Sequence, residues 1–134
     1  MQKIIAVSGY FIILHIGHIE YFREAANYGD VVCIVNNDEQ QKLKYGKIIV
    51  PMEERIQVLK DNKYISKVIP SVDRDRTVCK TLDNLRPMYF GKGGDRNTGN
   101  VPETEICEQL GIQMVFGLGN KIQSSSWLIS KLKQ

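Results

Sequence analysis

The chain has 134 residues, of which 43% are hydrophobic and 25% charged, and its formal net charge is +3. This length supports one globular domain with a hydrophobic core and is too short for two ordinary domains. The modest charge and the lack of a long basic run argue against nucleic-acid binding, and no segment has the length of a membrane span or the pattern of a signal peptide, so we expect a cytoplasmic protein.

The first half of the chain alternates strand-like with helix-like segments. Residues 3–7 form a β-rich run, and residues 16–27 follow with apolar side chains at helical spacing. A second apolar strand is predicted at 31–35, and a short capped helix follows it and runs to residue 43. Pro51 then starts another helix, which has acidic residues in its first turn and runs to about residue 62.

The second half continues this alternation. Strands are predicted at residues 68–70, 88–90 and 113–116, and helices from residue 75 or 77 to 85, at 102–110 and at 124–132. Alternating strands and helices predict a parallel sheet with right-handed crossovers. The expected fold class is therefore α/β, with one five-stranded parallel sheet and helices on both of its faces.

Four polar or glycine-rich loops follow predicted strands, at residues 8–14, 36–38, 91–100 and 117–123. Ligands of such sheets bind beyond the carboxyl ends of the strands, near the point where the strand order reverses. We therefore expect these four loops to converge on one ligand-binding mouth.

Three cysteines lie far apart within apolar patterns: Cys33, Cys79 and Cys107. An odd number at this spacing favours packing residues in a reducing compartment over a disulfide framework or a metal cluster.

The chain has only two histidines, His15 and His18, and they open the first predicted helix. Unpaired N–H groups and the helix dipole make a helix start attractive to phosphate. Two imidazoles there could grip phosphate oxygens and supply positive charge, and Gly9 and Gly17 remove side chains where a ligand or backbone comes close. The alternatives are a capping or packing role for the histidines, or a zinc site, for which no third ligand lies nearby.

Two later motifs also follow predicted strands. The loop from Gly93 to Arg96 contains glycines that permit close approach to a base or ribose, and Asp95 could accept hydrogen bonds there, although a simple turn would have the same composition. Three serines stand at the start of the last predicted helix, where hydroxyl and free N–H groups can bind phosphates or cap the helix: Ser124, Ser125 and Ser126.

The segment from Gly9 to His18 resembles the His-x-Gly-His signature of the nucleotidylyltransferase superfamily. Within it, the chain looks like the small cytidylyltransferases that activate glycerol 3-phosphate and the adenylyltransferases that activate heptose phosphate. The likeness runs nearly end to end, over residues 1–134, as one Rossmann-like domain. It includes Gly29-Asp30, Asn37-Asp38-Glu39, Pro51-x-x-x-Arg55, Gly93-Gly94-Asp95-Arg96 and Lys121 to Ser126.

This resemblance implies that a phosphate monoester attacks the α-phosphorus of a nucleoside triphosphate, CTP favoured and ATP possible, and that pyrophosphate leaves. It implies catalytic roles for His15, His18 and Lys44, with Lys47 as a competitor for the last role. Lys44 and Arg76 would also bind the phosphorylated substrate, which would be a polyol, sugar or amino alcohol, with Arg74 and Lys80 as alternatives to Arg76. The implied nucleotide-binding residues are Gly9, Tyr10, Phe11, Gly17, Arg55, Gly93, Asp95, Lys121, Ser124, Ser125 and Ser126. Mg²⁺ is expected to arrive with the triphosphate rather than in a protein cage, and a homodimer is expected.

The sequence departs from the family pattern at two places. Ile12 stands where an Asp is common, and Lys121 lies where many relatives have an Arg with its bidentate fork. Two interpretations follow: an active nucleotidyltransferase, which we favour because both histidines and all three serines are present, or a nucleotide-binding or regulatory module that has lost turnover. A dinucleotide-dependent oxidoreductase is disfavoured because Gly-x-Gly-x-x-Gly is missing after the first strand.

Overall fold

The computed structural model describes residues 3–94 and 99–119. Its elements follow in the order β1 (Ile4–Gly9), α1 (Ile16–Ala25), β2 (Asp30–Val35), α2 (Asp38–Tyr45), α3 (Met52–Lys60), β3 (Lys67–Pro70), α4 (Cys79–Leu85), β4 (Tyr89–Gly93), α5 (Thr104–Leu110) and β5 (Gln113–Leu118). The five strands form one sheet in the order β3-β2-β1-β4-β5, and all neighbouring pairs are parallel. The predicted α/β architecture is confirmed.

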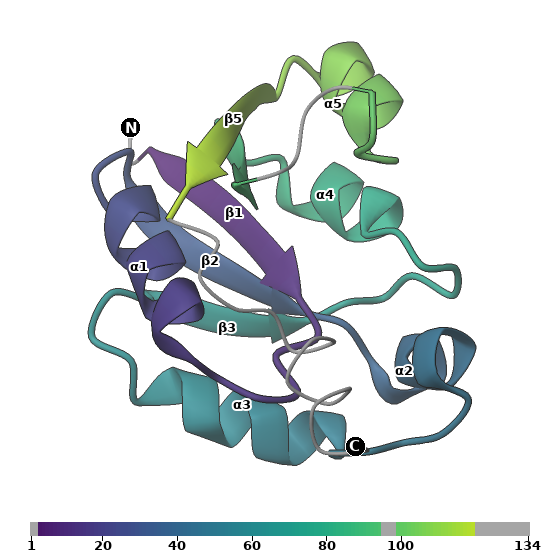
Figure 1. The fold of residues 1–134 in the computed structure, drawn as a ribbon. Helices are drawn as coiled ribbons and strands as arrows, with labels where there is room; N and C mark the ends of the chain where they lie inside the picture. The colour runs from purple at the N-terminus through teal and green to yellow at the C-terminus, as the bar shows by residue number, and fades with distance from the viewer. Residues whose placement is uncertain (1–2, 95–98, 120–134) are drawn as a thin grey trace.

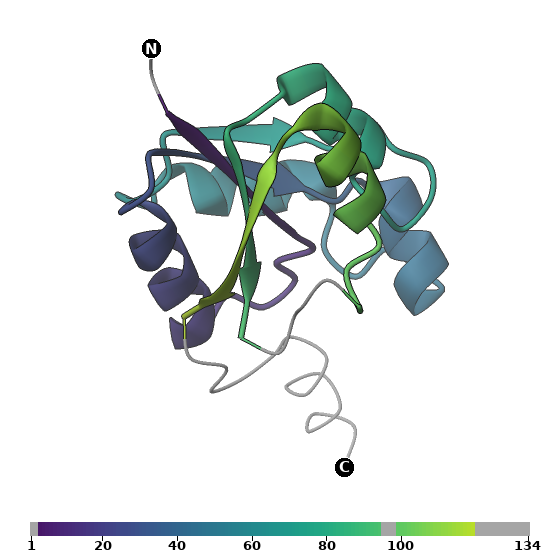
Figure 2. The ribbon, with the colours of Figure 1, turned by 90° about the horizontal axis from the view of Figure 1, so that it is seen from above.

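Helices cover both faces of the sheet (Figure 1). One buried apolar cluster joins side chains of β1 and β2 to α1 and α3, and a second joins β1, β2 and β4 to α4 and α5. Figure 2 shows the sheet from above, with α1 and α5 on opposite sides of it. β1 and β4 are neighbours whose following helices lie on opposite faces, so the strand order reverses between them. A ligand site is expected at their carboxyl ends.

β4 extends further than the sequence indicated. Its residues pair with β5 as far as Gly93, whereas the sequence predicted a loop from Gly91. A Cβ at Gly91 would lie 2.6 Å from Leu118 Cδ1 and 3.1 Å from Ile5 Cδ1. Gly91 is therefore required by the packing of β4 against its neighbours, and glycine here does not mark the end of the strand. The predicted helix at 124–132 lies outside the described residues.

The cysteines behave as packing residues. Cys33 and Cys107 are buried, Cys79 is half-buried, and all three are free thiols. Burial raises the pKa of each thiol, that of Cys107 to about 11, so thiolate chemistry is disfavoured at neutral pH.

Candidate functional site

The two histidines form the start of α1. His15 is the N-cap residue, and its Nδ1 accepts a hydrogen bond of 3.1 Å from the Gly17 backbone N–H. In return, His18 Nδ1 accepts the His15 backbone N–H at 3.4 Å, which completes a capping box. The imidazole rings stack, with centroids 3.9 Å apart and planes at 25°. The capping role considered from the sequence is thus confirmed.

Capping also fixes the protonation of the pair. Since each Nδ1 accepts a hydrogen bond, each ring carries its proton on Nε2 and presents an N–H donor there. Burial lowers the pKa of His15; burial, together with the neighbouring His15, lowers the pKa of His18 to about 4. Both rings are therefore neutral donors at pH 7, which corrects the expectation that they bring positive charge to the site.

One of these donors is left without a partner. His15 Nε2 is buried and has no hydrogen-bond acceptor within residues 3–94 and 99–119. A buried polar atom without a partner is uncommon in native proteins and is costly when it persists. An oxygen of a bound phosphate would satisfy this atom.

Phe11 anchors the loop between β1 and α1, because its ring packs into the apolar core. This residue has φ +53° and is 5% exposed, and its ring contacts the rings of His18 and Phe22, with centroids 5.2 and 5.5 Å away. A Cβ at Gly9 would lie 2.9 Å from Phe11 Cζ. Gly9 thus makes room for an aromatic side chain of the same loop. Ile12, which stands where an Asp is common in the family, is 9% exposed and so is packed inside the protein.

Tyr10 brings two of the predicted cations together. Lys44 Nζ lies 4.5 Å from the centroid of the Tyr10 ring, and Tyr45 meets that ring edge-on at 5.7 Å. Burial raises the pKa of Tyr10, so its phenol stays protonated at neutral pH. Arg76, from the loop between β3 and α4, lies close enough to the Tyr10 side chain for its charge to offset part of this rise in pKa. Two exposed cations from separate segments therefore flank the residue that follows β1, and this arrangement suits a phosphate group.

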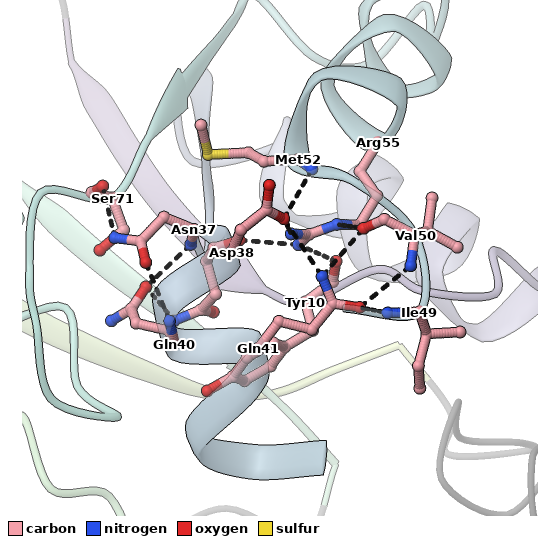
Figure 3. Close-up of polar contacts among 11 residues, drawn as sticks. Tyr10, Asn37, Asp38, Gln40, Gln41, Ile49, Val50, Met52, Arg55 and Ser71 are labelled. Atoms are coloured by element: carbon pink, nitrogen blue, oxygen red, sulfur yellow. Dashed lines mark hydrogen bonds and ion pairs between the residues drawn. The ribbon is translucent and has the colours of Figure 1, made fainter. Parts of the chain in front are cut away.

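Arg55 lies beside this cluster, and its guanidinium points inward. The residue is 2% exposed, and four of its five N–H donors bind the carbonyls of Tyr10, Asn36 and Val50 and the Asp38 carboxylate, at 2.7–3.1 Å (Figure 3). Most of the donors of Arg55 are thus used within the protein, and the nucleotide-binding role that the resemblance implied stays a prediction. Arg55 holds together the ends of β1 and β2 and the segment before α3, and it is a positioning residue.

Lys92 is a cation that the sequence analysis missed. It lies on β4, and its Nζ is 3.5 Å from Ser8 Oγ on β1, so it spans the two strands between which the strand order reverses. Gly93 follows it at the end of β4, where the site was predicted. The alternation of side chains along a strand could have placed Lys92 in the site, but only if the predicted strand had been extended to Gly93.

The C-terminal part of the predicted site is described only at its beginning. Gly119 has φ +71°, and a Cβ there would lie 2.9 Å from the Tyr21 backbone N and 3.3 Å from the Gly17 backbone O. The chain after β5 therefore passes directly against the first turns of α1. The remaining predicted nucleotide-binding residues lie outside the described residues: Asp95, Lys121, Ser124, Ser125 and Ser126.

Within the described ranges, no group of three or more His, Cys, Asp or Glu side chains could hold a metal ion. Over the same ranges, no helix has the length and apolar character needed to cross a membrane.

Known proteins resemble this chain in sequence and in fold. Residues 6–118 match the model of the cytidylyltransferase-like family. The chain is 36% identical over 126 residues to the bifunctional protein HldE of Hydrogenovibrio crunogenus, covering 90% of this chain and 24% of the relative, and 33% identical over 129 residues to that of Blochmanniella floridana, covering 93% and 26%. It thus spans about a quarter of the length of these curated relatives.

Among solved structures, the lipopolysaccharide core biosynthesis protein of Thermoplasma volcanium matches with a TM-score of 0.73 at 23% identity, over 90% of this chain and all of that one. This likeness supports the fold. Together with the family match over residues 6–118, the findings show that the chain belongs to the cytidylyltransferase-like family of nucleotidyltransferases.

Proposed function

We propose that this protein transfers a nucleotidyl group to a phosphorylated sugar or polyol. A phosphate oxygen of the acceptor attacks the α-phosphorus of a nucleoside triphosphate, the bond from the α-phosphorus to the bridging oxygen breaks, and pyrophosphate leaves. We favour CTP, and we propose ATP as the alternative nucleotide. The sugar-phosphate acceptor is consistent with the relationship to HldE and with the likeness to a lipopolysaccharide core biosynthesis protein.

The observation that carries this proposal is the neutral histidine pair at the start of α1. Two Nε2–H donors stand at the capped start of α1, and one of them is buried without an acceptor among the described residues. Donors that are already oriented stabilise the charge that develops on the phosphate oxygens, and they need little reorganisation when it develops. His15 and His18 are thus assigned to the triphosphate.

Lys44 and Arg76 are assigned to the acceptor phosphate. Lys44 contacts the Tyr10 ring, Arg76 lies near the Tyr10 side chain, and Tyr10 lies five residues from His15 in the same loop. An acceptor phosphate bound by these two side chains would meet the triphosphate beyond the end of β1. The cations would offset the repulsion between the two anions, which is the main electrostatic obstacle to the reaction.

Mg²⁺ fits this site as a companion of the nucleotide. The carboxylate cluster that a protein-held ion requires is missing from the described ranges, so the triphosphate oxygens would supply most of its ligands and the ion would neutralise their charge. We also propose a homodimer that acts in the cytoplasm, where nucleoside triphosphates are abundant. Light scattering of the purified protein tests the dimer.

The test of the proposed function is pyrophosphate release with CTP or ATP and a panel of phosphorylated acceptors that includes glycerol 3-phosphate and a heptose phosphate. We expect release with one pair of substrates and a fall of about 10²–10³-fold in kcat for His18→Ala, as for the loss of other transition-state donors. Circular dichroism checks that the variant remains folded. Nucleotide binding without release in the unmodified protein would refute catalysis and support the binding-module alternative.

A further inference from the structure

Gln40 connects α2 to the loop that carries Arg76. It is fully buried, and its amide uses all of its hydrogen-bonding capacity. Its Oε1 accepts bonds from Asn36 Nδ2 at 3.0 Å and from the Asn37 backbone N–H at 2.9 Å. Its Nε2 donates to the backbone carbonyls of Asp75 at 2.7 Å and Thr77 at 2.8 Å.

These last two bonds hold the carbonyls of the two residues that flank Arg76 in the chain. The loop from Ser71 to Val78 contains no helix or strand, so side chains take the place of a backbone ladder. Asn37 Nδ2 binds the carbonyls of Ser71 and Asp73 at 3.0 and 2.9 Å, at the other end of the loop (Figure 3 shows Asn37, Gln40 and Ser71). The start of α2 thus fixes the path of the loop.

α2 also carries Lys44, one turn after Gln40. α2 therefore holds both cations that lie near Tyr10: Lys44 is part of the helix, and the loop of Arg76 is bound to it through the amide of Gln40. A phosphate that binds two cations gains from a fixed separation between them, because ordering them does not then have to occur at the moment of binding.

We propose that Gln40 is a positioning residue that sets Arg76 relative to Lys44, so that the two cations bind the acceptor's phosphate as one site. This inference rests on the proposed function for the identity of the ligand. The four hydrogen bonds of Gln40, its full burial and the contact of Lys44 with the Tyr10 ring carry the geometry.

The chain supplies a matched control in Gln41. It is also fully buried on α2, but its amide binds the segment before α3, through the backbone N–H of Ile49 at 2.7 Å and the carbonyl of Val50 at 2.9 Å. Gln40→Met and Gln41→Met each remove one buried amide of the same helix. Only the first releases the loop of Arg76.

The probe is inorganic phosphate, followed through the side-chain Nε–H resonance of Arg76 in a ¹⁵N–¹H NMR spectrum and assigned by its loss in Arg76→Ala. We expect phosphate to shift this resonance in the unmodified protein, and Gln40→Met to weaken phosphate binding by about tenfold, as supporting residues around a site commonly do. Gln41→Met should change it by less than about twofold, since its bonds lie elsewhere. Gln40→Asn, which keeps an amide but shortens its reach, provides a second variant with the same expected direction.

In the transfer assay, Gln40→Met should raise KM for the phosphorylated acceptor and leave KM for the nucleotide unchanged, and it should have no further effect in the Arg76→Ala background. Equal losses in the Gln40 and Gln41 variants, or no response of Arg76 to phosphate in the unmodified protein, would overturn the inference. Phosphate binding that depends on Gln40 in a protein without turnover would overturn the proposed function alone.

Discussion

Arg55 provides the sharpest test of how this site is held together. Arg55→Met keeps much of the apolar stem and removes the guanidinium. It breaks three bonds to the carbonyls of Tyr10, Asn36 and Val50 and one to the Asp38 carboxylate. Each hydrogen bond contributes about 1 kcal/mol net, and more when a charged group donates.

The Asp38 contribution must be discounted, because its side chain is 37% exposed and water can replace part of the lost contact. The three carbonyl bonds then dominate the loss, and the free energy of unfolding should fall by about 3–5 kcal/mol, within the range for breaking a buried charged contact. Arg55→Lys should recover only part of this loss, because an ammonium group cannot reproduce the planar fork.

The assay is urea unfolding without nucleotide, with the midpoint and the slope both measured. The control is Arg86→Ala, which removes an exposed ion pair to Asp83 and should change stability by no more than about 0.5 kcal/mol. A loss below about 1 kcal/mol for Arg55→Met would refute the assignment of Arg55 to holding the loops, and would return it to the ligand-binding role that the resemblance implied.

Three further outcomes are expected. The pKa of His18 is lowered from 6.5 to about 4 in the folded protein, so between these pH values the unfolded chain binds one more proton than the folded chain. The free energy of unfolding should therefore be full above about pH 6.5 and fall by up to about 3 kcal/mol as the pH drops towards 4. Urea unfolding at several pH values should show a shallower fall for His18→Gln. Lys44→Ala should lower the rate of pyrophosphate release by about 10²-fold while the unfolding midpoint stays within error, since Lys44 is exposed; an unchanged rate would remove it from the site. Gly119→Ala should destabilise the protein by about 2 kcal/mol more than Gly46→Ala in thermal unfolding. Both glycines have positive φ, but only a Cβ at position 119 would lie 2.9 Å from the Tyr21 backbone N. Equal losses in the two variants would show that this contact is relieved at no cost.

Much of the fold was readable from local patterns. The alternation of apolar strands with helical spacing predicted five parallel strands and helices on both faces, and the position of the histidine pair at the first helix was also correct. The extent of β4 was predicted wrongly. Glycine is typical of loops, whereas Gly91 lies in the sheet because neighbouring side chains leave no room for a Cβ.

Side-chain direction in the candidate site could not be predicted in this way. The resemblance placed Arg55 at the nucleotide site, but only the structure shows that its guanidinium binds backbone carbonyls of three segments. Gln40 gave no sequence signal beyond its place in a helix start, although its bonds reach residues 35 and 37 positions away. Likewise, the Lys92 contact with Ser8 joins residues 84 positions apart.

The primary structure thus specifies which segments are strands and helices, and where the first helix begins at the histidine pair, because hydrophobic period and capping act over a few neighbouring residues. The meeting of Tyr10, Lys44 and Arg76, and the inward turn of Arg55, were decided by the strand order β3-β2-β1-β4-β5 and by the loops that cross its carboxyl edge. These contacts depend on the relative placement of elements that are far apart in the chain, and no local period encodes that placement.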